Sequence, residues 1–143
     1  MIEKEIKAPR GIRNNNPLNI RRGSAWKGLK ATQTDKEFCE FESMQMGIRA
    51  ALILMRNHIT GFSGSRPRMN TLRKLIGVWA PPTENATERY IDQVAKRVGI
   101  SPTQIIDPTD RKLITGIAYE MAAVECGLYV DESYFKSAWD LIV

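Results

Sequence analysis

The sequence predicts a mainly α-helical protein, with one domain over residues 1–143 and a small loop or β-hairpin region near the N-terminus. Two observations lead to this fold class. From Met46 onward, apolar residues recur every three or four positions, in segments bounded by capping residues and by Gly or Pro. Up to about Ser43, short apolar pieces alternate instead with turn-forming residues. A chain of 143 residues is long enough to form one hydrophobic core.

Turn signals divide the N-terminal region at Asn16-Pro17, Arg22-Gly23-Ser24 and Lys27-Gly28. Between and after these turns, Leu18–Arg21 and Glu37–Phe41 are the two segments that could form strands. Both are too short for their periodicity to separate a strand from a loop. We therefore expect loops and a short hairpin here.

The first predicted helix begins near Met46 and is followed by a loop over Gly61–Pro67. A second helix starts at Asn70 or Thr71, either of which can cap it, and ends at Pro81-Pro82. The apolar faces expected to enter the core are Ile48, Ala51, Leu52, Met55 and Ile59 in the first helix, and Leu72, Leu75, Ile76 and Trp79 in the second.

A third helix is expected to start at Thr83 or Asn85 and to close before Gly99, where a left-handed residue can end it. Proline is favoured in the first turn of a helix, so Ser101-Pro102 predicts the start of a short fourth one. The apolar stripe of the third helix consists of Tyr90, Ile91, Val94 and Val98.

The longest predicted helix opens at Asp107-Pro108 and ends at Gly127, and a last helix follows Asp131. Two adjacent apolar rows run along the longest helix: Leu113, Ile117, Met121 and Val124 in one, and Ile114, Ala118 and Ala122 in the other. The apolar residues of the last helix are Tyr134, Phe135, Ala138, Trp139 and Ile142.

Composition and charge limit the class of protein. The chain is 43% hydrophobic and 26% charged, as in ordinary globular proteins. No apolar run approaches the roughly 20 residues that span a bilayer, so we expect no stable membrane insertion. The N-terminus lacks the apolar stretch of a secretory signal. A net charge of +5 favours a polyanionic partner, but the basic residues are dispersed and form no helical face typical of nucleic-acid binding.

The inventory of reactive side chains excludes several chemistries. His58 is the one histidine, so a metal site built on two or three imidazoles has no ligand set, and we expect no metal. No phosphate-binding or dinucleotide-binding glycine pattern occurs, so we expect no cofactor. We expect His58 to be partly exposed near a helix C-terminus, where the helix dipole favours its cation. Cys39 and Cys126 could pair with each other, or either could form a nucleophilic pair with His58. Because the sequence has no secretory signal and no local nucleophile signature, we expect two reduced, buried thiols instead.

After these exclusions, carboxylates are the remaining candidates for catalytic side chains. Among the candidate acids Glu40, Glu42, Glu84, Glu120 and Glu125, the last lies at the end of an apolar helix, in Ala122-Ala-Val-Glu-Cys-Gly127. Partial burial there would raise its pKa, as a general acid in glycoside hydrolysis requires. The alternative is that Glu125 is one more solvated residue near a helix C-terminus.

Several short motifs occur along the chain in a recognisable order. They are Gly11-Ile-Arg-Asn-Asn-Asn-Pro-Leu-Asn-Ile20, Trp26-Lys-Gly28, Gly47-Ile-Arg-Ala50 and Trp79-Ala-Pro-Pro-Thr-Glu-Asn-Ala-Thr-Glu-Arg-Tyr90. Together they resemble a phage and prophage family that is similar to the cystoviral lytic enzyme and includes virion proteins and lytic transglycosylases. The resemblance extends from Gly11 to about Trp139, and it implies a lysozyme-like fold that degrades peptidoglycan.

A second resemblance concerns the order of the segments. Asn16-Pro17-Leu-Asn-Ile-Arg21 and Trp26-Lys-Gly28 are similar to segments of soluble lytic transglycosylases and of flagellar-type N-acetylglucosaminidases. In those enzymes a helix ending in the catalytic glutamate precedes them, whereas here the similar helix end, Ala122–Gly127, is C-terminal. The resemblance therefore implies a circularly permuted lysozyme-like domain, in which Glu125 lies beside the Asn-rich segment. The family triplet is usually Glu-Asn-Gly, so the role of Cys126 is in doubt.

The resemblance and the chemistry of the side chains together name the site residues. Glu125 is the expected catalytic acid and Glu84 the second choice. Four asparagines could bind sugar hydroxyls and N-acetyl groups, or could build turns: Asn14, Asn15, Asn16 and Asn19.

Aromatic and polar side chains complete this expected site. Trp26 and Trp79 could stack on sugar rings or pack in the core. The segment that holds Glu84 and also Asn85, Thr87 and Tyr90 is similar to the Glu-Thr-x-x-Tyr segment lining the cleft of lytic transglycosylases. Alternatively, Asn85 and Glu88 form a capping box. Arg13, Arg21 and Arg49 are interpreted as ordinary surface cations unless they converge on a groove.

The expected function is that of a phage or prophage endolysin, a muramidase or lytic transglycosylase that cleaves the β-1,4 bond between N-acetylmuramic acid and N-acetylglucosamine. The expected partner is bacterial peptidoglycan, and we expect a monomer that binds no nucleic acid. Without a secretory signal, the protein would stay in the host cytoplasm until release to the wall, or would be carried in the virion. The alternatives are a peptidoglycan endopeptidase and a non-catalytic virion or wall-binding protein.

Overall fold

The computed structural model describes residues 8–80 and 83–142, with Glu84 and Asn85 described by their backbone alone. The described residues are mainly helical, which confirms the expected fold class at that level. The helices are α1 (Arg10–Arg13), α2 (Met44–Gly64), α3 (Leu72–Trp79), α4 (Glu84–Val98), α5 (Arg111–Cys126) and α6 (Glu132–Asp140). None of them is both long enough and apolar enough to cross a membrane.

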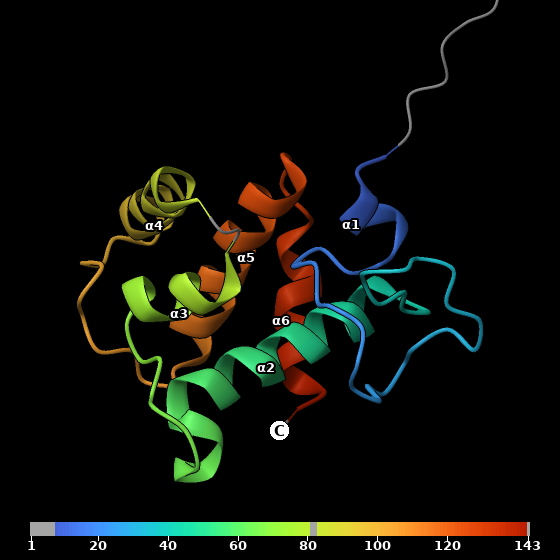
Figure 1. The fold of residues 1–143 in the computed structure, drawn as a ribbon, viewed down its shortest axis with the longest axis horizontal. Coiled ribbons are helices and arrows are strands. Elements are labelled where there is room, and N and C mark those ends of the chain that lie inside the picture. Colours follow the sequence, from blue (N-terminus) through green and yellow to red (C-terminus); the bar gives the residue numbers. More distant parts are fainter. Residues whose placement is uncertain (1–7, 81–82, 143) are drawn as a thin grey trace, which may run out of the picture.

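The helices are arranged around α2 and α5. In Figure 1, α2 runs across the molecule, with the N-terminal region at one side and α3 and α4 at the other. α2 packs chiefly against α6, while α5 packs against both α4 and α6. The buried residues form one hydrophobic cluster between these elements. Its largest fully buried members include Leu18, Phe41, Ile48, Leu52, Met55, Ile91 and Phe135.

The N-terminal region is held together by side chains more than by a sheet. The two segments predicted as strands, Leu18–Arg21 and Glu37–Phe41, lie side by side, but only an isolated antiparallel bridge joins them. The fully buried Asn16 side chain takes the place of some backbone hydrogen bonds of a β-sheet, because its Nδ2 donates to the carbonyls of Ile20 (3.0 Å) and Cys39 (2.9 Å). The predicted hairpin is therefore a pair of loops with hairpin-like contacts.

α2 begins and ends where its sequence indicates. The Ser43 hydroxyl caps the helix by accepting from the amide of Met46 at 3.2 Å. From Gly61 the backbone is left-handed, with φ of 69° at Gly61, so the regular helix stops where the loop was predicted. Gly61 is required there because a Cβ would collide with the carbonyl oxygen of Arg66.

Some ends of α3, α4 and α5 lie where the sequence predicted them, and others do not. Thr71 caps α3, and Gly99 and Gly127 end α4 and α5 in left-handed conformations, as expected. Thr83 occupies the position before α4 but makes no capping bond with its side chain. Asn85 lies inside α4, so its predicted capping box is wrong. The stop predicted at Pro81-Pro82 lies outside the described residues.

Two predicted helix starts were wrong. Ser101-Pro102 forms a turn, because the short segment before the next helix uses its backbone to hold α3 instead. The amide of Ile106 donates to the carbonyl of Asn70 at 2.8 Å. α5 begins at Arg111, capped by Asp110, and not at Asp107-Pro108. The last helix, α6, is capped by Asp131 as predicted.

Candidate functional site

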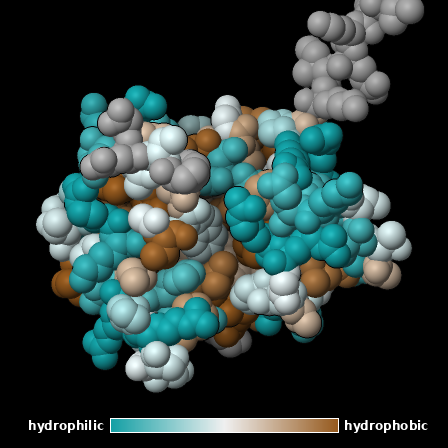
Figure 2. Space-filling model, in the orientation of Figure 1, coloured by the Kyte–Doolittle hydropathy of each residue, from teal (hydrophilic) through white to brown (hydrophobic). Residues whose placement is uncertain are grey.

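A cleft of about 680 Å³ lies where the N-terminal region meets the helices. Figure 2 shows the surface hollowed between the hydrophilic N-terminal region and the side of the molecule formed by α3 and α4. The N-terminal region lines one side with Asn19 and Arg21, and α4 lines another with Arg89 and Tyr90. The C-terminal turn of α5 contributes Glu125.

Glu125 and Asn19 are in direct contact in this cleft. The Asn19 Nδ2 donates to the Glu125 Oε1 at 2.9 Å, although 106 positions separate the two residues in the sequence. The expected proximity of Glu125 to the Asn-rich segment is therefore confirmed. The catalytic role of Glu125 stays a prediction.

Burial shifts the ionisation of Glu125 toward its protonated form. The low-polarity surroundings raise the pKa of the carboxyl, because burial disfavours its charged form. Hydrogen bonds from the side chains of Asn19 and Tyr90 act in the opposite direction, but burial is the larger effect. Glu125 therefore keeps its proton to a higher pH than an exposed glutamate does.

Tyr90 is the second polar group at the carboxyl. Its side chain is buried, and the hydroxyl also lies 3.4 Å from the carbonyl oxygen of Met121. Burial, followed by the nearby Glu125 carboxylate, raises the pKa of Tyr90 well above its usual value. The hydroxyl consequently stays neutral and able to donate.

The local backbone brings Asn19 to the end of α5. Asn19 itself is left-handed, with φ of 53°, a conformation that asparagine tolerates better than most residues. Gly11 allows a close approach, because a Cβ there would lie 3.0 Å from the Cys126 Sγ and 3.2 Å from the Asn19 Oδ1. The Cys126 thiol donates to the carbonyl of Pro17 at 3.3 Å. Cys126 thus joins α5 to the N-terminal region beside the acid.

The other three asparagines have structural partners and do not line the cleft. Asn14 donates to the Asp35 carboxylate at 3.0 Å, and Asn15 donates to the carbonyl of Phe41 at 3.1 Å. The Asn16 side chain donates to the carbonyls of Ile20 and Cys39 and accepts from the amide of Ile20, all within the N-terminal region. Of the two roles open to the four asparagines, the fold gives turn and loop contacts to these three, and Asn19 alone among the four lines the cleft.

Of the aromatic and α4 candidates, some line the cleft and others do not. Trp79 lines the cleft, and its Nε1 donates to the carbonyl of Leu18 at 2.9 Å, which fixes the indole. Trp26 packs against the core and does not line the cleft. Thr87 also lies off the cleft wall, and its hydroxyl donates to the carbonyl of Thr83 at 3.1 Å. The side chains of Glu84 and Asn85 lie outside the described residues.

Sequence reasoning missed two cationic residues of the cleft. Arg21 was interpreted as an ordinary surface cation, and Arg89 was not considered at all. The position of Arg21, two residues after Asn19, is a signal that could have found it. Arg89 directly precedes Tyr90 in the motif Trp79–Tyr90, and this position is the signal that could have found it.

The remaining acids have other partners. Glu40 accepts hydrogen bonds from the amides of Thr34 and Asp35, and these bonds lower its pKa. Glu120 accepts from the Tyr129 hydroxyl at 2.6 Å, and Glu42 is exposed. Among the candidate acids whose side chains are described, Glu125 alone lines the cleft.

The thiols and the histidine do not form a nucleophilic pair. Cys39 and Cys126 are free and buried, as expected, and burial raises the pKa of Cys126 to about 11. The His58 ring contacts the rings of Phe62 and Trp79 instead. His58 is half-buried near the end of the regular part of α2, as expected, but burial lowers its pKa and so disfavours the cation. The described residues contain no group of three or more His, Cys, Asp or Glu that could hold a metal.

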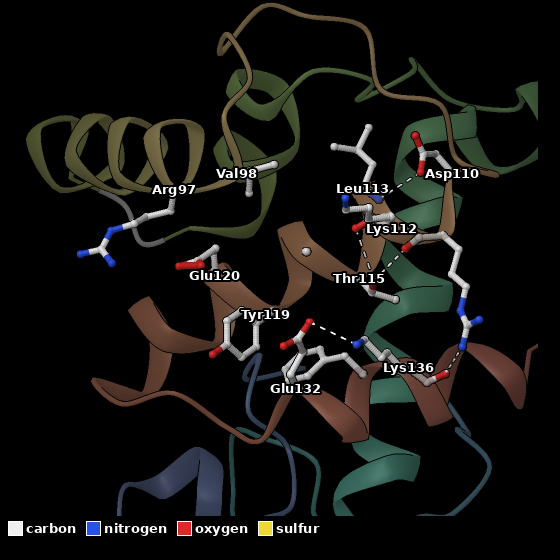
Figure 3. Close-up of a pocket in the computed structure, with 13 residues that line it drawn as sticks. Arg97, Val98, Asp110, Lys112, Leu113, Thr115, Tyr119, Glu120, Glu132 and Lys136 are labelled. Atoms are coloured by element: carbon white, nitrogen blue, oxygen red, sulfur yellow. Dashed lines mark hydrogen bonds and ion pairs between the residues drawn. The ribbon is translucent and has the colours of Figure 1, made fainter.

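A larger cavity, of about 820 Å³, lies between the end of α4 and the helices α5 and α6. Figure 3 shows that its charged side chains surround an opening in which Glu132 pairs with Lys136, at 3.5 Å. Glu132 is exposed, and Glu120 is engaged by Tyr129. This cavity is larger than the Glu125 cleft, but neither glutamate is a buried acid free to act on a ligand.

The chain is similar to a bacteriophage protein. Over 101 residues it is 39% identical to Protein P5 of Pseudoalteromonas phage PM2. The aligned part covers 68% of this chain and 60% of Protein P5, so the chain spans less than two thirds of that relative. No protein-family model matches the sequence.

Proposed function

We propose that this protein cleaves the glycan of bacterial peptidoglycan, as a muramidase or lytic transglycosylase that uses Glu125 as its general acid. One observation carries the proposal: a partly buried carboxyl of raised pKa lies in a cleft, hydrogen-bonded to Asn19. Cleavage of a glycosidic bond requires an acid that is still protonated near neutral pH and is placed beside the leaving oxygen. Similarity to a bacteriophage protein is compatible with a lytic role.

Each contact of Glu125 has a use in this reaction. Burial keeps the carboxyl protonated until the glycosidic oxygen accepts its proton. The donors Asn19 and Tyr90 then stabilise the carboxylate that remains, because both hydrogen bonds favour the charged form. Trp79, held by its bond to Leu18, gives the cleft a flat apolar face for a sugar ring.

The number of acids bears on the choice between hydrolase and transglycosylase. Glu125 is the one carboxyl that lines the cleft among the side chains described. A hydrolase uses a second acid or an activated water, whereas a transglycosylase lets the muramic acid side chain attack after one acid has acted. The cleft therefore favours the transglycosylase. Mass spectrometry of the products separates the two, because anhydromuramic ends form only in the transglycosylase reaction.

Glu125→Gln tests the proposal, because the amide keeps the shape of the side chain but cannot donate a carboxyl proton. We expect the release of soluble fragments from purified peptidoglycan sacculi to fall by about 10²–10⁴-fold. Glu120→Gln, the same substitution on the same helix but outside the cleft, should retain activity. Near-normal lysis by Glu125→Gln would overturn the assignment. Binding to sacculi without any release by the unmodified protein would indicate a wall-binding protein instead.

A further inference from the structure

The Glu125 cleft carries two positive charges that the proposed cleavage step does not use. Arg21 reaches the cleft from the N-terminal region and Arg89 from α4, so the charges come from different walls. Between these walls, Glu125 is the one acid among the described lining residues, and burial raises its pKa. The cleft is therefore electropositive when the acid is ready to act.

Both guanidinium groups are available to a ligand. Arg89 is exposed, and no acidic side chain in the described part of the chain pairs with it. Arg21 has Glu37 as a partner at 3.6 Å, but both side chains are mostly exposed (73% and 55%). Such an exposed pair is worth little and can exchange for a better-placed anion. The Phe38 ring lies 5.2 Å from the Arg21 guanidinium and supports it at the cleft.

The arginines line the cleft from the N-terminal region and α4, whereas Glu125 belongs to α5. A cation next to Glu125 would lower its pKa, but the groups that shift this pKa are its buried surroundings, Asn19 and Tyr90. Arg21 and Arg89 therefore line the cleft without neutralising the acid. They are placed to contact a part of the ligand other than the bond that Glu125 protonates.

Peptidoglycan carries suitable anions beside its glycan chain. Its glycan is a chain of N-acetylated sugars, and its negative charge lies on the carboxylates of the peptide stems. Guanidinium groups bind carboxylates through paired hydrogen bonds, with more directional specificity than an ammonium group provides. We propose that Arg21 and Arg89 bind peptide-stem carboxylates and make the cleft selective for acidic, peptide-bearing glycan. This inference rests on the proposed function for the identity of the glycan.

The experiment compares two forms of one substrate. Purified sacculi are used directly, or after their carboxylates have been converted to amides with carbodiimide and ammonia. Co-sedimentation measures binding, and released soluble fragments measure cleavage. The proteins are the unmodified chain, Arg21→Gln, Arg89→Gln and Arg89→Lys, with Arg13→Gln as the matched control. Arg13 is an exposed arginine outside the cleft, so its loss changes the net charge equally.

We expect each cleft substitution to weaken binding to untreated sacculi by about 5- to 10-fold, the effect of losing one partly exposed charged contact. Amidation should weaken binding of the unmodified protein and of Arg13→Gln most, and that of Arg21→Gln and Arg89→Gln less, because each of these two variants keeps one cleft arginine. Arg89→Lys should recover part of the binding, because it restores the charge without the paired geometry.

The outcomes separate this inference from the proposed function. If the protein cleaves both forms of sacculi equally and the arginine substitutions behave like Arg13→Gln, carboxylate recognition is wrong and the glycosidase proposal stands. If binding depends on the carboxylates and on both arginines but no fragments are released, recognition stands and the glycosidase proposal is wrong.

Discussion

At the scale of single residues, Asn19 connects the two ends of the chain at the cleft. Its left-handed backbone directs the amide across to Glu125 on α5. Asn15, four residues earlier, has nearly the same φ (52° against 53°), but its amide binds the carbonyl of Phe41. Two residues of one type and one conformation therefore have different roles, one in the cleft and one in the loop.

This pair gives a matched test of how Glu125 is tuned. Asn19→Gly tolerates the left-handed backbone but removes a hydrogen bond that lowers the pKa of Glu125, so that pKa should rise further. A general acid works in its protonated form. The alkaline limb of the pH–activity profile should therefore move to higher pH, measured as initial rates of fragment release.

Asn15→Gly is the control for that measurement, because it makes the same change at a left-handed residue outside the cleft. Its alkaline limb should stay where the unmodified protein has it. A profile for Asn19→Gly that is unmoved, or moved to lower pH, would show that the Asn19 amide does not tune the acid.

At the scale of elements, the N-terminal region is fitted closely to the first turn of α2. A Cβ on Gly47 would collide with the carbonyl oxygen of Asn15 and lie 3.3 Å from the Phe41 ring. Gly47 is helical, so the need for glycine here is a close approach and not an unusual backbone angle.

Gly47→Ala should consequently destabilise the protein. We expect the free energy of unfolding, measured by denaturant titration, to fall by about 1–3 kcal/mol, the usual cost of overpacking. Gly77→Ala in α3 is the control, because a Cβ there meets nothing within 4 Å. Gly77→Ala should raise the free energy of unfolding by about 0.5–1 kcal/mol, since alanine is the better helix former. Equal effects of the two substitutions would contradict the close approach.

The elements that sequence reasoning located correctly are those whose signals are local. Thr71 and Asp131 cap helices that were predicted to start there, and Gly99 and Gly127 end helices as predicted. Errors arose where the backbone of a segment forms hydrogen bonds with another segment that is distant in the sequence. Ser101-Pro102 has the sequence pattern of a helix start, but backbone hydrogen bonds from this segment hold the start of α3 instead.

At the scale of the whole molecule, the buried acid should reduce stability. The folded-state pKa of Glu125 lies above its ordinary value of 4.5. Between these two values the folded protein binds more protons than the unfolded chain, so the free energy of unfolding falls as the pH rises through that range. Glu125→Gln removes this cost and should be more stable than the unmodified protein at neutral pH.

Denaturant titrations at neutral pH and below pH 4.5 would measure the difference. The advantage of Glu125→Gln should shrink at the lower pH, where the unmodified carboxyl is protonated in both states. Glu42→Gln, the same substitution at an exposed glutamate, is the matched control. An advantage that is equal at both pH values would point to packing instead of ionisation.

The sequence by itself determined the mainly helical fold and singled out Glu125, because helix periodicity and the apolar character of α5 are properties of neighbouring residues. The motif order further indicated that Glu125 lies near the Asn-rich segment. Only the tertiary structure decided that Asn19 is the asparagine that contacts it and that Arg21 and Arg89 face the same cleft. Side chains in irregular loops take their direction from contacts with distant segments, which no local pattern in the sequence encodes.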